Sequence, residues 1–139
     1  MKIDIQWQGK MEFKTDTPSG HHITMDASAE VGGENLGPRP TEMLLSAVGT
    51  CSGIDIVDIL AKMRLEVQSF SMEVSGERAD EFPKKFTDVH MHYRLTGDLP
   101  AEKVRRAVQL SVEKYCTVSN SLSARITASF EVNGERFNI

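Results

Sequence analysis

The sequence predicts an α+β fold in which antiparallel sheets wrap around a long central helix. The stretch from Pro40 to Met63 is apolar nearly all round, which is typical of a helix buried in a core. Before and after it, apolar and polar residues alternate along short segments, the pattern of strands with one buried face. Strands grouped on either side of helices favour an α+β architecture, and 139 residues fit one domain.

Three short strands are expected ahead of the long helix. Residues 3–7 alternate, residues 8–9 form a turn, and residues 11–13 continue the alternation, which together predict a hairpin. Residues 23–27 are expected to form the third strand. The segment 30–40 is rich in glycine and proline, and we expect a loop there that leads into the helix.

The long helix is expected to begin at Pro40, because the N–H group that proline lacks would have had no partner in a first turn. A single helix of about 24 residues would span roughly 36 Å. The alternative is two helices that are broken near Gly49 to Gly53. Charged residues within the stretch argue against a membrane span. They are Glu42, Asp55, Asp58 and Lys62.

Two further strands are expected after the helix. An alternating run over residues 65–74 changes phase near Ser69, which indicates a bulge or a break in the strand. A polar connection follows over residues 76–85. Residues 89–96 alternate strictly and predict a strand with one wet face.

A second helix is expected over residues 101–116, opened by Pro100 and apolar along one face. A short helix over 117–123 follows, for which Thr117 or Ser119 is available as the N-cap.

A last strand over residues 126–132 ends at Asn133-Gly134, which is a hairpin turn signal. So large an apolar helix beside an exposed sheet, in so small a chain, suggests a homodimer.

Charge and composition exclude several classes of partner. The formal net charge is −4 and no basic run stands out, so nucleic acid is not an expected partner. Residues 1–10 alternate and do not resemble a secretory signal, so we expect a cytoplasmic protein with no membrane partner. In that compartment the two cysteines are expected to be thiols with a chemical role instead of a permanent disulfide.

Cys51 is the main candidate for chemistry. If the helix breaks at Gly49 to Gly53, free N–H groups near Cys51 would favour its thiolate. Asp55, one turn further along, would instead disfavour the thiolate. The alternative is that Cys51 is a small apolar residue in a buried helix. Cys116 lies at the end of the second helix, which disfavours a thiolate, whereas the start of the next short helix would favour one. Taken alone, Cys116 is better interpreted as structural.

The histidines give a weaker signal. His90 and His92 share a strand face and are possible metal ligands, but no other ligand spacing supports a site, and a solvated face is the better interpretation. No phosphate-binding loop or nucleophile elbow is present. We therefore expect no metal and no cofactor.

Three motifs taken together resemble the OsmC/Ohr family, and within it the YhfA-like branch. They are a proline-led helix that contains a cysteine (RPTEMLLSAVGTC), its long apolar continuation (SGIDIVDILAKMRL), and a second cysteine in C-x-V-S-N-S-L after another helix. The resemblance covers nearly the whole chain, and the expected order of strands and helices agrees with it.

The resemblance implies one OsmC-like domain over residues 1–139, in an intertwined homodimer with active sites at the subunit interface. It also implies a stress-related thiol peroxidase that reduces organic hydroperoxides. Cys51 matches the peroxidatic cysteine, which is oxidised to a sulfenic acid. Cys116 matches the resolving cysteine, and a dithiol such as a lipoylated protein then reduces the disulfide.

The sequence departs from the family pattern in the groups that activate the thiol. The family's peroxidases use an arginine from the N-terminal region and a glutamate that orients it. Arg39 is the only arginine before Cys51, and Glu42 stands one position after the expected glutamate, so these two residues are the candidates for those roles. The alternative function is a dimeric small-molecule-binding or redox-sensing protein without turnover.

Overall fold

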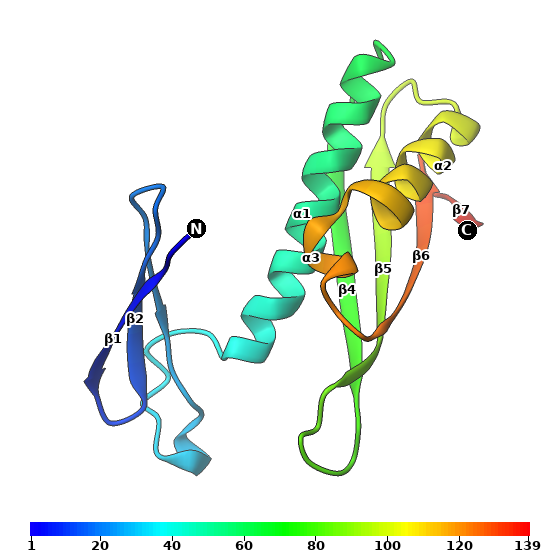
Figure 1. The fold of residues 1–139 in the computed structure, drawn as a ribbon. Helices are drawn as coiled ribbons and strands as arrows, with labels where there is room; N and C mark the ends of the chain where they lie inside the picture. Colours follow the sequence, from blue (N-terminus) through cyan, green and yellow to red (C-terminus); the bar gives the residue numbers. More distant parts are fainter. The chain divides into compact units, whose positions relative to one another are not determined.

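The computed structural model describes all of residues 1–139, and the chain forms two compact units, residues 1–44 and 45–139. The N-terminal unit is a three-stranded antiparallel sheet in the order β1-β2-β3, drawn in blue in Figure 1. Its elements are β1 (Asp4–Gly9), β2 (Glu12–Asp16), β3 (His22–Met25) and the 3₁₀ helix η1 (Ala29–Val31). The expected hairpin and third strand are confirmed. We predict one OsmC-like domain over residues 1–139. Whether the two units form one domain is not tested by their separate description, so this stays a prediction.

The C-terminal unit is a four-stranded sheet that carries helices on one face (Figure 1). Helix α1 (Pro40–Lys62) begins in the N-terminal unit and continues into this one. The strands are β4 (Ser69–Arg78), β5 (Phe86–Thr96), β6 (Arg125–Val132) and β7 (Glu135–Asn138). Between β5 and β6 lie α2 (Ala101–Leu110), the π-helical segment η2 (Ser111–Tyr115) and α3 (Thr117–Asn120).

The sheet is mixed, and the expectation of purely antiparallel strands is wrong at one pair. The order is β4-β5-β6-β7, in which β5 and β6 run parallel. Parallel neighbours need a crossover connection of a dozen or more residues, and α2, η2 and α3 supply it. The turn at Asn133-Gly134 joins β6 to an antiparallel β7, as expected.

Helix α1 is unbroken, so the alternative of two helices is wrong. Its glycines serve close packing on β4, which runs beside it in Figure 1. A Cβ atom at Gly49 would lie 2.7 Å from Val74 Cγ2, and one at Gly53 would lie 2.7 Å from Met72 Cε. The absence of side chains at these positions therefore lets the helix approach the strand.

Only one face of α1 is buried within a single chain. The buried positions are Val48, Gly49, Ser52, Gly53, Ile56 and Leu60. On the opposite face Ile54 is 65% exposed and Val57 is 49% exposed, so the expectation of a helix buried all round is not met by one chain. By length and composition α1 could cross a membrane, a test that the core helix of a soluble protein also passes. Its packing on β4 favours a core helix.

In the C-terminal unit one of two expected alternatives is confirmed and two local expectations are corrected. The strand β4 begins only at Ser69, so the phase change there is a strand break. The N-cap of α3 is Cys116, whose sulfur accepts a hydrogen bond from the Ser119 backbone N–H, and it is neither of the residues expected. On β5 the expectation of a solvent-exposed polar face is wrong at His92. This side chain is 7% exposed, forms a hydrogen bond with Ser129 and lies beside the Glu131 carboxylate.

The packing of α1 on β4 predicts opposite effects for two glycine substitutions. Gly49→Ala should lower the free energy of unfolding by roughly 1–3 kcal/mol, since its new methyl group meets Val74, a side chain with a stiff χ1 angle. The new methyl group of Gly53→Ala meets only the mobile end of Met72. Glycine inside a helix is about 1 kcal/mol less favourable than alanine, so this substitution should be neutral or stabilising. Urea unfolding of both variants tests this, and equal destabilisation would contradict the packing described.

Candidate functional site

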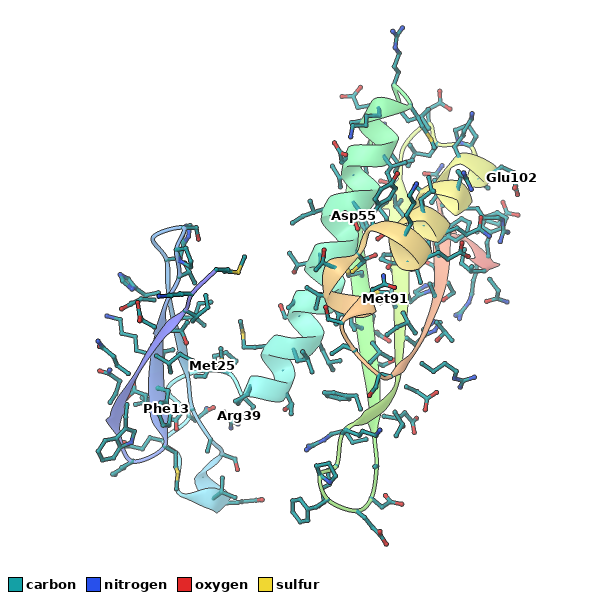
Figure 2. The ribbon with its side chains drawn as sticks, viewed as in Figure 1. Phe13, Met25, Arg39, Asp55, Met91 and Glu102 are labelled. Carbon is teal, nitrogen blue, oxygen red and sulfur yellow. The ribbon has the colours of Figure 1, made fainter.

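Two thiols and one carboxylate meet in the C-terminal unit. The sulfur atoms of Cys51 and Cys116 and a carboxylate oxygen of Asp55 all lie within 4.8 Å of one another. Cys51 and Asp55 come from one side of α1, and Cys116 follows directly after η2. Figure 2 labels Asp55 on the side of α1 that faces the ribbon of η2 and α3. The fold therefore brings together two cysteines that are far apart in the sequence.

Cys116 is fixed by the backbone around it. Its N–H group donates to the Ser111 carbonyl oxygen at 2.8 Å, which closes the π-helical turn. Its sulfur accepts from the Ser119 N–H group at 3.4 Å and lies 4.0 Å from the Val48 carbonyl oxygen. The Asn120 side-chain amide donates to the Cys116 carbonyl oxygen at 2.8 Å. Single π-helical turns occur often at functional sites.

The two thiols differ in access to solvent. Cys116 is fully buried, and Cys51 is partly exposed. Burial raises the pKa of the Cys116 thiol, and the nearby Cys51 adds to the rise, whereas the hydrogen bonds from Ser119 lower the pKa only in part. Cys51 is therefore the thiol that a dissolved molecule can reach first.

The helix end that would activate Cys51 is absent. Because α1 runs unbroken from Pro40 to Lys62, the backbone near Cys51 is engaged within the helix. The i+4 carboxylate of Asp55 does lie beside the thiol, as its position in the sequence indicated.

A buried chain of hydroxyl groups holds the Asp55 carboxylate. The Ser111 hydroxyl donates to Asp55 Oδ2 at 3.0 Å and shares a hydrogen bond of 2.9 Å with Ser52. Because Ser111 donates to Asp55, Ser52 donates to Ser111, and the Tyr93 hydroxyl donates to Ser52. Burial raises the pKa of Tyr93, so its hydroxyl stays protonated. Sequence reasoning missed this chain, and its only signal was serine at two apolar helix positions.

Arg39 and Glu42 have structural partners within the N-terminal unit. The Arg39 guanidinium, labelled in Figure 2, donates to Asn35 Oδ1 at 2.7 Å and to the Gly37 carbonyl oxygen at 3.1 Å. Glu42 accepts a hydrogen bond of 2.8 Å from the Arg39 backbone N–H, which is half of a capping box at the start of α1. Their predicted catalytic roles stay predictions.

Asp26 anchors the loop that leads into α1, and sequence reasoning missed it. It is 3% exposed, and its carboxylate accepts hydrogen bonds from the backbone N–H groups of Ala27, Glu34 and Leu36. Burial alone would raise the pKa of the Asp26 carboxyl, but these N–H groups and the charge of Arg39 outweigh burial and lower it. The signal for this role was the loop over residues 30–40, which is rich in turn residues. The backbone N–H groups of such a loop need hydrogen-bond acceptors, and a nearby aspartate can supply them.

The histidines bond to neighbouring side chains and take no part in the thiol cluster. His22 pairs with Asp16, and His21 bonds Ser19. His90 bonds Thr127 and Ser129, and burial lowers its pKa.

Comparisons with known proteins agree over nearly the whole chain. A family model described as "OsmC-like protein" matches residues 32–131. "Protein YhfA" of Escherichia coli (strain K12) is 41% identical over 135 residues, which cover 95% of this chain and 98% of that protein. A solved hypothetical protein from Aquifex aeolicus VF5 is similar at a TM-score of 0.84 and 31% identity, with 95% of each chain covered. An organic hydroperoxide resistance protein OsmC from Legionella pneumophila shares the fold at a TM-score of 0.68 and 19% identity, covering 95% of this chain and 96% of its own.

The anchoring of Asp26 predicts a pH-dependent contribution to stability. Because its folded-state pKa is lowered, that contribution is present above the unfolded value of about 3.9 and is lost as pH falls through the lower folded value. Asp26→Asn should therefore melt at a lower temperature than the wild type at neutral pH, and the difference should shrink in acid. Thermal unfolding at several pH values measures it, with the exposed Asp4→Asn as control. A difference that persists at low pH would contradict the assignment.

Proposed function

The chain belongs to the OsmC-like protein family, in its YhfA-like branch, and we propose that it is a thiol-dependent peroxidase that reduces organic hydroperoxides. The observation that carries the proposal is the approach of Cys51 and Cys116 to within 4.8 Å. The Legionella protein of the same fold bears the name of an organic hydroperoxide resistance protein, which supports the same substrate class.

The different exposure of the two thiols supports the order in which they act in the proposed reaction. The Cys51 thiolate attacks one peroxide oxygen, so that an S–O bond forms and the O–O bond breaks. The alcohol leaves with one added proton, and Cys51 becomes a sulfenic acid. Cys116 then attacks the Cys51 sulfur, the S–O bond breaks, and the hydroxyl leaves as water with the proton of Cys116. An external dithiol returns two electrons by thiol–disulfide exchange.

Formation of the disulfide requires a modest local movement. The sulfur atoms of a disulfide are about 2.05 Å apart. The sulfur atoms of Cys51 and Cys116 lie within 4.8 Å of each other, so they must move closer to form the bond. Cys51 lies within the long helix α1, whereas Cys116 lies between the π-helical turn and the four-residue α3. The proposed movement is therefore that of Cys116.

The proposal includes a homodimer formed through the exposed face of α1. A groove of about 670 Å³ runs along this face, lined mainly by apolar residues. The full lining is Thr50, Gly53, Ile54, Val57, Asp58, Ala61, Phe70 and Met72. Continuous exposed apolar surface of this kind marks interaction sites. A second copy of the chain, lying along the same face, would complete the burial of the helix.

The remaining roles are proposed from the family pattern. Arg39 and Glu42 would supply the cation and the carboxylate, for which Arg39 must exchange its contacts with Asn35 and Gly37 for the reacting groups. The proposed reductant is a dithiol such as a lipoylated protein, and the proposed location is the cytoplasm. No resident cofactor is needed for this cycle.

A second candidate function is a redox sensor that is oxidised once and does not turn over. The position of Asp55 favours it, because the charged group beside Cys51 is a carboxylate instead of the cation that activates a reactive cysteine.

The peroxidase proposal predicts that Cys51→Ser abolishes hydroperoxide turnover. Removal of a catalytic nucleophile costs on the order of 10⁶ in rate in a well-studied hydrolase, so no activity should remain above background. Consumption of cumene hydroperoxide with dihydrolipoamide as reductant measures this. In Cys116→Ser the first oxidation should persist, and mass spectrometry should detect oxygen added at Cys51 instead of a disulfide.

Two outcomes would separate the candidate functions. If the wild type shows no turnover but forms a disulfide with one equivalent of peroxide, the peroxidase proposal is wrong and the redox-sensor function is supported. Full turnover in Cys51→Ser would exclude both.

The proposed dimer predicts that Ile54→Glu yields monomers. A charge at this 65% exposed position would be buried without a partner in the dimer. Light scattering at micromolar protein measures the mass, and Phe82→Glu is a matched control, because Phe82 is 87% exposed but lies far along the chain in the β4–β5 connection. A wild-type mass equal to that of one chain would contradict the proposal.

A further inference from the structure

We infer that Cys51, Asp55 and Cys116 form a binding site for one thiophilic divalent metal ion of the zinc class. The inference goes beyond the proposed peroxidase, and its binding part does not depend on that activity. The three ligand atoms already lie within 4.8 Å of one another. In a tetrahedral zinc site, bonds of about 2.3 Å to sulfur and 2.1 Å to oxygen place ligand atoms roughly 3.5–3.8 Å apart. Side-chain adjustments of about an ångström would complete the geometry.

The three ligands come from two well-defined elements. Cys51 and Asp55 are four residues apart on α1, so both project from the same side of one helical turn. Cys116 approaches from the end of η2. This division resembles other metal sites in which two ligands share a helical turn and a third comes from elsewhere in the chain.

The groups around the ligands already orient them. The Ser111 hydroxyl donates to one Asp55 oxygen at 3.0 Å, and Ser52 and Tyr93 extend the same hydrogen-bonded chain into the core. The Ser119 N–H group donates to the Cys116 sulfur, an interaction that stabilises a bound thiolate. Metal ligands in proteins are commonly supported by a second layer of hydrogen bonds of this kind.

The charge of the cluster favours a cation. Asp55 takes part in none of the ion pairs of the structure, and its one side-chain hydrogen bond comes from a neutral hydroxyl. Two thiolates added beside this carboxylate would repel it and one another. A divalent ion at their centre removes the repulsion.

An ion can reach the cluster from solvent. Asp55 lines a pocket of about 430 Å³ whose other residues include Asp58, Lys62, Leu110 and Tyr115. Cys51 is also partly exposed. Three protein ligands leave a fourth tetrahedral position for water. Two sulfur ligands select against magnesium and calcium, which prefer oxygen, and favour zinc among the common divalent ions.

Metal binding and disulfide formation exclude each other. Binding converts both thiols to thiolates and releases two protons without electron transfer, whereas the disulfide forms by loss of two electrons from the same sulfur atoms. On the proposed function, the ion would therefore inhibit oxidation of the pair, and oxidation would release the ion.

Cobalt(II) titration of the reduced full-length protein tests the site, because tetrahedral cobalt–thiolate complexes absorb visible and near-ultraviolet light, where zinc complexes are transparent. The wild type should bind one equivalent per chain with a thiolate-to-metal absorption band, and zinc should displace the cobalt. Cys51→Ser and Cys116→Ser should lose the band. Ser111→Ala removes the hydroxyl that supports Asp55 and that also bonds Ser52, but it leaves all three ligands in place, so it should weaken binding roughly 10-fold or more.

Asp55→Asn and Asp58→Asn form the matched pair. Both aspartates line the same pocket, but only Asp55 belongs to the cluster. Asp55→Asn should weaken cobalt binding more than Ser111→Ala does, and Asp58→Asn should bind like the wild type. Absence of the band in the reduced wild type, or equal weakening by the two aspartate variants, would overturn the inference.

A separate measurement addresses the consequence for oxidation. Zinc-loaded protein should react with one equivalent of cumene hydroperoxide more slowly than the metal-free protein, as followed by thiol labelling. Equal rates would overturn the inhibitory role. If the metal-free wild type lacks peroxidase turnover but binds cobalt as described, the proposed function fails and the metal site stands. If it shows turnover but does not bind cobalt, the metal site fails and the proposed function stands.

Discussion

The close contact between α1 and β4 is the constraint on which the C-terminal unit depends. Gly49 and Gly53 allow the helix to lie against Met72 and Val74 without a side chain between them. This contact fixes the rotation of α1 about its axis. One side of the helix then carries Cys51 and Asp55 toward η2, and another exposes an apolar groove. The glycines that suggested a break in the helix instead determine which way its thiol faces.

The order of elements followed from local patterns, since alternation, caps and turn residues act over a few positions. The predictions that were wrong depend on contacts between residues that lie far apart in the sequence. The parallel partner of β5 lies beyond a three-helix crossover, and the burial of His92 comes from its neighbours Ser129 and Glu131 on β6. The candidate cysteines were visible in the sequence, but their approach and the support from Ser111 required the fold.

Arg39 and Glu42 illustrate why residue type alone does not establish a role. The guanidinium of Arg39 closes the loop that Asp26 anchors, and Glu42 satisfies a backbone N–H at the start of α1. Such contacts stabilise the entry into the helix whether or not the residues also act in catalysis. A catalytic role for Arg39 therefore has to compete with its loop contacts, and the free energy of those contacts sets the cost of activation.

No cationic side chain forms an ion pair with Asp55 in the thiol cluster, and this connects the proposed chemical fates of the cluster. A thiolate at Cys51 or Cys116 adds negative charge beside a carboxylate in a partly buried site, which is unfavourable. A disulfide relieves the repulsion because it removes the sulfur charges, and a divalent ion relieves it because it compensates them. A neighbouring cation would be a third solution, and it would keep a free thiolate ready for peroxide. Peroxidase turnover, redox sensing and metal binding thus differ in how the same excess of negative charge is neutralised.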